Sequence, residues 1–362
     1  MDSTNELEMQ EPSIETDKLS YEIFSILESN FLFGYDDPKL WFPNPQSQQP
    51  PPVKNQRGKI CILAIDGAGM RGILAGKALA YLEAALKKKS GDHNATIADY
   101  FDVAAGAGVG GIFTGLEKAV KEAFTAENRS LTLKDTLKPV FDFRLWEVCR
   151  ATSAEPGLFE PVQMRSVDGQ TKCVAVDGGL AMSNPTGAAI THVLHNKQEF
   201  PFVRGVEDLL VLSLGTGQLL EVSYDFDRVK RWKAKDWARP MARISGDGSS
   251  DLVDQAVAMA FGHSRSTNYV RIQANGSSMG RCGPNVDTDA SPGNVKMLIG
   301  IAEEMLKQEN VESVLFGGKR IGEQSNFEKL DWFAGELVQE HQRRSCRIAP
   351  TVAFKQATPK AT

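Results

Sequence analysis

The feature that most constrains this chain is a repeated unit of apolar strand, glycine-rich turn and helix. Lys59–Asp66 (KICILAID) is a short apolar run with β-branched residues, which is typical of a buried strand. It ends in the turn DGAGMRG (66–72), and Ile73–Lys89 follows with apolar residues at helical spacing. Tyr100–Ala105 repeats the unit, because GAGVGG (106–111) leads from it into another helix. The repetition predicts an α/β fold with a mainly parallel central sheet.

Two more strands are predicted further along the chain. Cys173–Val176 ends in Asp-Gly-Gly (177–179), and Asp208–Leu214 ends in Gly-Thr-Gly (215–217). Open α/β sheets place their ligand crevice beyond the carboxyl ends of the strands, so we expect the four turns to build one site. Asn294–Gln308 has the spacing of an amphipathic helix.

The chain divides into three regions by composition. Residues 1–57 form an acidic and proline-rich N-terminal extension, in which Tyr21–Phe33 is predicted to be a short amphipathic helix that packs on the body or binds a partner. Residues 58–320 form the main domain, and residues 321–362 form a C-terminal helix and a basic tail. The tail is either solvated or attracted to anionic lipid through its basic side chains, Arg343, Arg344, Arg347, Lys355 and Lys360.

Charge and cysteine usage limit the class of partner and the compartment. The net charge of −5 argues against a nucleic-acid partner. The five cysteines are scattered, with no Cys-x-x-Cys pair, which suits a reducing compartment. We see neither a secretory signal nor an apolar run of about 18 residues. We therefore expect a cytoplasmic protein that is not secreted and that contacts membranes only peripherally.

The second glycine turn has the skeleton of a serine-hydrolase elbow. A strand that runs into Gly-x-Ser-x-Gly and then a helix is the nucleophile elbow, and here Gly106 and Gly110 stand in place but Gly108 occupies the serine position. The elbow residue often has φ > 0, a conformation that glycine adopts at little cost. Glycine at position 108 therefore stabilises the turn, but it also lacks the hydroxyl oxygen with which a serine would attack.

The first glycine turn matches the spacing of a dinucleotide fingerprint, Gly67-x-Gly69-x-x-Gly72. The context argues against a nucleotide, because Asp66 would put a carboxylate beside the phosphates, so we expect no cofactor. Two interpretations remain. The turn either presents backbone N–H groups to an oxyanion, with Arg71 adding charge or holding the loop, or it is a tight structural turn.

Carboxylates and histidines supply the remaining candidates. Asp177, followed by Gly178 and Gly179, is either a general base for a hydroxyl or a water, or a turn-capping aspartate. A hydrolase triad would need a histidine, but His192 and His195 fall within a predicted helix, and these two and His263 are better explained as structural residues. Asp287-x-Asp289-x-Ser291 lacks the glycine and the final acid of a calcium loop, so no metal site is predicted.

Taken in order, these motifs resemble those of the patatin-like phospholipase family. DGAGMRG (66–72), GAGVGG (106–111), DGG (177–179), SNPT (183–186) and SLGTG (213–217) follow that family's order, and the likeness covers about Lys59–Gly280. More narrowly, the chain resembles the plant group III patatin-related proteins, whose elbow carries glycine in place of serine. The resemblance implies a patatin-like three-layer sandwich for residues 58–320.

The resemblance also implies a site. The family uses a serine–aspartate dyad without histidine, an oxyanion hole in the first glycine turn, and membrane phospholipids and galactolipids as substrates. Residue by residue, Asp177 matches the dyad aspartate and Gly108 the nucleophile position. Gly67, Ala68 and Gly69 match the oxyanion loop.

Three departures put activity in question. Gly108 lacks the nucleophile, Ala68 replaces a glycine, and the interval between Gly111 and Phe141 is shorter than in the family, as in a truncated isoform. Two functions follow. One is a weak lipolytic acyl hydrolase in which Asp177 orients a water. The other is a catalytically inactive lipid-binding or scaffold protein on the same fold.

Overall fold

The computed structural model describes residues 58–67, 69–114, 143–197, 199–217, 225–262, 265–274, 279–283, 285–315 and 318–345. The chain divides into two units, Met1–Gln56 and Arg57–Thr362, and every described residue lies in the second. The predicted helix Tyr21–Phe33, the candidates Ala68 and His263, and most of the short interval before Phe141 therefore lie outside the described residues.

Four parallel strands form the central sheet, in the order β2-β1-β5-β6. They are β1 (Ile60–Ile65), β2 (Val103–Gly106), β5 (Leu209–Leu214) and β6 (Tyr269–Ile272). The predictions for β1 and β5 are confirmed. β2 begins later than predicted because Ile97–Asp99 form the 3₁₀ turn η2, in which the Tyr100 N–H bonds back to the Ile97 carbonyl.

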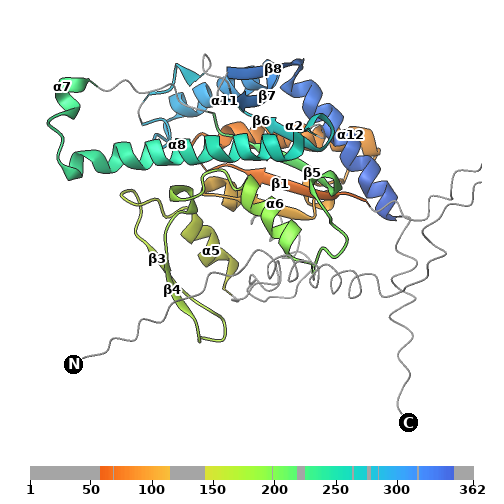
Figure 1. Cartoon of the computed structure of the whole chain (residues 1–362), viewed down its shortest axis with the longest axis horizontal. Helices are drawn as coiled ribbons and strands as arrows, with labels where there is room; N and C mark the ends of the chain where they lie inside the picture. Colours follow the sequence, from red (N-terminus) through yellow and green to blue (C-terminus); the bar gives the residue numbers. More distant parts are fainter. Residues whose placement is uncertain are drawn as a thin grey trace, which may run out of the picture. The chain divides into compact units, whose positions relative to one another are not determined.

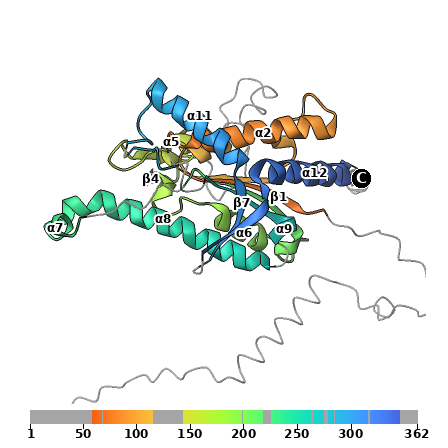
Figure 2. The same ribbon diagram turned by 90° about the horizontal axis from the view of Figure 1, so that it is seen from above.

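Helices cover both faces of this sheet, as Figure 2 shows. One face carries α2 (Gly72–Ser90), α11 (Pro292–Lys307) and α12 (Asn326–Ser345), and the other carries α6 (Thr186–His195) and α8 (Ala234–Phe261). The predicted α/β sandwich with a mainly parallel sheet is therefore confirmed.

The hydrophobic core follows the alternation of the buried strands. Leu63 and Ile65 of β1 pack into the cluster with α2, α11 and α12, whereas Ile62 packs into the cluster with α6 and α8. Strands that are buried on both faces read as continuous apolar runs, which is why β1 and β5 could be found in the sequence.

The strand before Asp177 does not belong to the central sheet, contrary to the expectation that all four turns end strands of one parallel sheet. β4 (Lys172–Ala175) pairs antiparallel with β3 (Val162–Arg165) in a separate two-stranded sheet, and α5 (Leu145–Thr152) packs against β3. Only one face of this hairpin is covered, because alternate residues of β4 are exposed. A central strand would be covered on both faces.

Several elements were not predicted from the sequence. α8 forms a helix of 28 residues in a region that composition had marked only as charged surface. β7 (Glu309–Leu315) and β8 (Gly318–Ser325) form a hairpin that leads into α12 (Figure 1). The remaining short elements are η3 (Gly178–Leu180), η4 (Val206–Asp208), α7 (Phe226–Val229) and α9 (Arg265–Asn268). Among the described helices, none combines the length and the apolarity that a bilayer span requires.

Candidate active site

The elbow after β2 adopts the conformation that its glycines predict. Gly108 has φ = +54°, a left-handed backbone conformation that costs side-chain-bearing residues free energy. Gly106 permits a close approach, because a methyl group on its Cα would lie 2.2 Å from the Gly110 carbonyl oxygen. Residues 109–114 then form a helical turn, so strand, elbow and helix follow one another as predicted.

Asp177 lies beside this elbow. A methyl group built on the Cα of Gly108 would be 3.2 Å from Oδ2 of Asp177 and 3.6 Å from its Oδ1. The predicted approach of these two turns is therefore confirmed. A side chain at position 108 would point at the Asp177 carboxylate, whereas the buried glycine that is present places no side chain there.

Asp177 has the capping role, one of the two that the sequence left open. It caps η3, since its Oδ1 accepts a hydrogen bond from the Gly179 N–H at 2.7 Å, and its own N–H donates to the Ala154 carbonyl. Among the described residues, no donor contacts its Oδ2. Burial raises the pKa of the Asp177 carboxyl, and the Gly179 hydrogen bond opposes that rise only in part.

The first glycine turn lies against the elbow and is held by backbone hydrogen bonds. A methyl group on Gly67 would be 3.1 Å from the Ala107 carbonyl. The Gly67 N–H, a predicted oxyanion donor, donates to the Ser183 carbonyl at 2.9 Å, whereas the N–H of Gly69 has no acceptor among the described residues. Of these two N–H groups, that of Gly69 is therefore the one whose donor is not used within the described residues.

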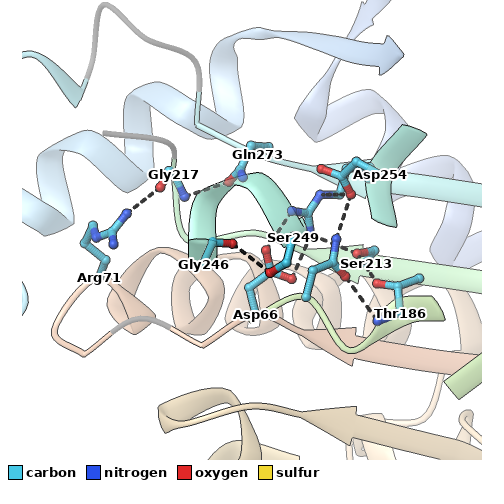
Figure 3. A network of polar contacts seen from close by, with 11 residues as sticks. Asp66, Arg71, Thr186, Ser213, Gly217, Gly246, Ser249, Asp254 and Gln273 are labelled. Atoms are coloured by element: carbon cyan, nitrogen blue, oxygen red, sulfur yellow. Dashed lines mark hydrogen bonds and ion pairs between the residues drawn. The ribbon is translucent and has the colours of Figure 1, made fainter. Parts of the chain in front are cut away.

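Arg71 holds the loop instead of adding charge to it. Its Nε donates to Oδ1 of Asp287 at 2.7 Å, and a second guanidinium nitrogen donates to the Gly217 carbonyl. Figure 3 shows the Arg71 side chain directed at Gly217. The interaction ties the first turn to the turn after β5, so of the two roles predicted for Arg71 the geometry favours the structural one.

A buried arginine joins the remaining motifs. Arg271 of β6 forms two hydrogen bonds with Asp66, at 3.0 Å to Oδ1 and 2.6 Å to Oδ2, and a third with Ser213 Oγ at 2.8 Å. Its Nε lies 3.2 Å from Oδ1 of Asp254 on α8. The guanidinium thus neutralises two carboxylates that reach it from β1 and α8.

The Ser-Asn-Pro-Thr motif completes this network. Asn184 donates to Asp254 at 2.8 Å and accepts from the Thr186 N–H, and the hydroxyls of Thr186 and Ser213 lie 2.7 Å apart. Figure 3 shows Thr186, Ser213 and Asp254 on the same side of Asp66. Three of the five sequence motifs, all but the elbow and Asp-Gly-Gly, therefore contribute to one assembly of hydrogen bonds and ion pairs around Arg271.

The pKa values of the charged groups in this network shift in the directions expected from burial and from ion pairing. Burial raises the pKa of the Asp66 carboxyl to about 6, although Arg271 opposes the shift. Burial alone would lower the pKa of Arg271, but the Asp254 and Asp66 carboxylates raise it, so the guanidinium stays charged. A buried charge of this kind depends on its partners.

Sequence reasoning missed Arg271 and Asp254. The signal for Arg271 was available, since it is a charged residue inside the apolar strand YVRI, where only a paired charge is tolerated. No comparable signal marked Asp254, because it lies in a helical stretch, residues 246–255, that contains other aspartates.

The other candidates lie in structural settings. His192 and His195 belong to α6, and the His192 ring packs edge-on against Phe200 with the ring centroids 6.2 Å apart. Asp289 accepts from the backbone N–H and the hydroxyl of Ser291, the residue that caps α11, and Asp287 is the partner of Arg71.

An aspartate that faces a strand–elbow–helix turn, beside a glycine loop at a helix start, is the architecture of an acyl hydrolase. Comparison with known proteins supports this class. Residues 113–190 match a family model described as Patatin-like phospholipase. The chain is 60% identical to Patatin-like protein 6 of Arabidopsis thaliana, over 97% of this chain and 89% of that protein. It is 63% identical to Patatin-like protein 7 of the same plant, over 98% and 87%.

The chain therefore belongs to the patatin-like protein family. A more distant relative, 36% identical over 89% of this chain and 92% of its own length, is named "Probable inactive patatin-like protein 9". The alignment with Patatin-like protein 6 extends over 449 residues, more than the 362 of this chain. The relative thus carries segments that this chain lacks.

Proposed function

We propose that this protein is a weak lipolytic acyl hydrolase that releases fatty acids from membrane phospholipids and galactolipids, with a water in place of the serine nucleophile. The observation that carries the proposal is the 3.2 Å between Oδ2 of Asp177 and a methyl group built on Gly108. The carboxylate is aimed at the place where a nucleophile would stand. Family membership supports lipolytic hydrolysis in general.

The reaction needs one proton acceptor and one oxyanion donor. Asp177 accepts a proton from a water beside Gly108 as the water oxygen bonds to the ester carbonyl carbon. The N–H of Gly69 stabilises the negative charge on the carbonyl oxygen. Collapse of the tetrahedral intermediate breaks the bond to the alcohol oxygen, which takes the proton back from Asp177. No acyl-enzyme forms, because Gly108 has no hydroxyl.

This chemistry is slow on general grounds. Hydrolases that lose their nucleophile retain on the order of 10³–10⁴-fold acceleration over water, from the oxyanion hole and binding alone.

The elbow glycine supports our proposal that the chain is one of the group III patatin-related proteins. The four described cysteines are free thiols, which fits the cytoplasmic, peripherally membrane-associated location that we propose. The segments that the relative carries and this chain lacks support the proposal that this chain is a truncated isoform.

The second candidate is a catalytically inactive lipid-binding or scaffold protein. The observation that favours it is the absence of a nucleophile at Gly108, together with a relative whose name describes it as inactive. Asp177 would then act only as the cap of η3.

Release of fatty acid from mixed phospholipids and galactolipids by the purified full chain separates the two candidates. We expect slow release, lowered about 10²-fold in Asp177→Asn, the lower end of what a general base contributes. Asp92→Asn is the matched control, since Asp92 is an exposed loop aspartate whose hydrogen bond from Asn94 an asparagine can keep. Release that is the same in both variants would favour the inactive lipid-binding protein.

A further inference from the structure

α7 and the first part of α8 form an exposed segment, residues 226–244, which we call the basic arm. Figure 1 shows α8 running past the sheet, with α7 beyond its end. None of the side chains described in the basic arm is buried. Core packing therefore does not explain which residues stand there.

The charge of the basic arm is opposite to that of the whole protein. Residues 226–244 contain seven lysines and arginines against two aspartates, whereas the chain carries a net charge of −5. The described basic side chains are exposed or only partly covered, Arg228, Lys230, Arg231, Lys233, Lys235 and Arg243. This local excess of positive charge attracts an anionic surface.

An apolar stripe runs along the same helix. Trp237, Met241 and Ile244 are spaced four and three residues apart, so they share one face of α8, and they are 36%, 61% and 54% exposed. Leu252 and Met259 continue that face at 66% and 75% exposure. The opposite face carries the residues that pack on the sheet, so α8 presents one apolar face to the core and another to solvent.

Aromatic rings accompany the charges. Trp232 packs edge-on against Trp237 with the centroids 5.0 Å apart, and Lys230 lies 6.0 Å above the ring of Phe226, which is 74% exposed. Exposed tryptophan, phenylalanine and methionine among lysines and arginines are typical of helices that lie in the headgroup region of a bilayer.

α8 also connects the basic arm to the candidate active site. It packs against η3, the turn that Asp177 caps, and the exposed apolar side chains of Leu180 and Met182 follow in the chain. The helix that carries the basic arm thus also contacts the turn whose aspartate an ester would have to reach.

We propose that the basic arm is the surface by which this protein docks on an anionic phospholipid bilayer. The stripe at Trp237, Met241 and Ile244 enters the headgroup boundary while the lysines and arginines contact lipid phosphates. The positive charge of the basic arm argues against a second copy of the chain as its partner, because two basic arms in a symmetric contact would repel each other. The inference builds on the proposed function but concerns binding, which is measured without hydrolysis.

The described part of the C-terminal tail is less suited than the basic arm to bind lipid. Arg343 pairs with Glu340 at 2.6 Å, and Arg344 pairs with Asp102 and donates to the Lys59 carbonyl. These two charges are already neutralised within the protein, whereas among the described side chains of the basic arm the ion pair found is that of Arg243 with Asp247, at 3.9 Å.

Co-sedimentation of the full chain with vesicles tests the proposal. We expect binding to phosphatidylcholine vesicles that contain phosphatidylserine, and little binding to phosphatidylcholine alone. Lys230→Gln/Lys233→Gln/Lys235→Gln should weaken binding at least tenfold. Lys88→Gln/Lys89→Gln/Lys296→Gln, which removes the same charge from other exposed positions, should leave it unchanged.

A second pair of variants tests the apolar stripe. Met241→Ser/Ile244→Ser should also weaken binding at least tenfold, and Leu158→Ser/Val167→Ser, two similarly exposed residues elsewhere, should not. Tryptophan emission should shift to the blue on adding vesicles, and Trp237→Phe should reduce that shift. Asp177→Asn should bind as the unaltered chain does, so that a failure of hydrolysis and a failure of docking are distinguished.

Three results would overturn the proposal. The first is equal loss of binding in both lysine triples, which would mean an unspecific charge effect. The second is unchanged binding in the variants of the basic arm. The third is a dimer in sedimentation velocity that Met241→Ser/Ile244→Ser dissociates, which would assign the stripe to a second copy of the chain.

Discussion

Asp66 and Asp177 begin two turns of nearly the same sequence, Asp-Gly-Ala and Asp-Gly-Gly, yet their surroundings differ in almost every respect. Asp66 is 3% exposed, and both of its oxygens receive hydrogen bonds from Arg271. Asp177 is half-buried, with one backbone donor on Oδ1 and position 108 before Oδ2. Both oxygens of one carboxylate are committed to holding the fold, whereas Oδ2 of the other has no donor among the described residues.

The difference teaches that the local motif does not assign the role. Both aspartates follow a strand, and both precede glycines that let the chain turn. Asp66 meets a buried guanidinium because β6 lies beyond β5 in the sheet, and Asp177 meets the elbow because the β3–β4 hairpin delivers it there. Three predictions test this division of labour.

The largest effect is expected where the structural carboxylate loses its cation. Arg271→Met leaves Asp66 and Asp254 buried without a positive partner and should lower the free energy of unfolding by about 3–5 kcal/mol. Urea or thermal unfolding measures it. Asp177→Asn, which keeps the acceptor for the Gly179 N–H, should change the free energy of unfolding by less than about 1 kcal/mol. Similar losses in both variants would erase the contrast between the two aspartates.

A gain of function is expected at the elbow. Gly108→Ser places a hydroxyl beside the Asp177 carboxylate, and we expect ester hydrolysis to rise at least tenfold, with new covalent labelling by fluorophosphonate probes. Stability should fall by roughly 1 kcal/mol, because serine must adopt a positive φ. Gly91→Ser is the matched control for that cost, since Gly91 has φ = +74° and no neighbour within 4 Å of an added methyl group.

The double variant Gly108→Ser/Asp177→Asn should lose both the faster ester hydrolysis and the covalent labelling. A folded Gly108→Ser protein that neither labels nor hydrolyses faster would show that the site is impaired beyond its nucleophile. The inactive lipid-binding protein would then be the better description.

The smallest effect concerns the pH dependence of hydrolysis. A general base must be deprotonated, and burial raises the pKa of Asp177, so activity should rise with pH around a midpoint above the ordinary aspartate value of about 3.9. A pH–rate profile of the unaltered chain measures the midpoint. The residual rate of Asp177→Asn should lack this inflection, and its persistence would point to another group as the base.

Much of the framework could be predicted from the sequence. Lys59–Asp66 and Asp208–Leu214 stood out because strands buried on both faces must be continuously apolar. The elbow could be recognised because its glycines are needed wherever a Cβ would strike the backbone, as at Gly106, or where φ is positive, as at Gly108. Such local requirements leave a mark on the residues that meet them.

Only the tertiary structure decided which groups meet. The sequence indicated neither that Cys173–Val176 belongs to a separate hairpin nor that Asp254 approaches Arg271, since both depend on contacts between residues far apart in the chain. The same holds for the basic arm, whose lysines and tryptophans were visible in the sequence as charged surface. That they lie on one long helix, with a second apolar face turned to solvent, follows from how the other face of α8 packs on the sheet. Local sequence determines which conformations the backbone can adopt, whereas burial and partners are properties of the folded whole.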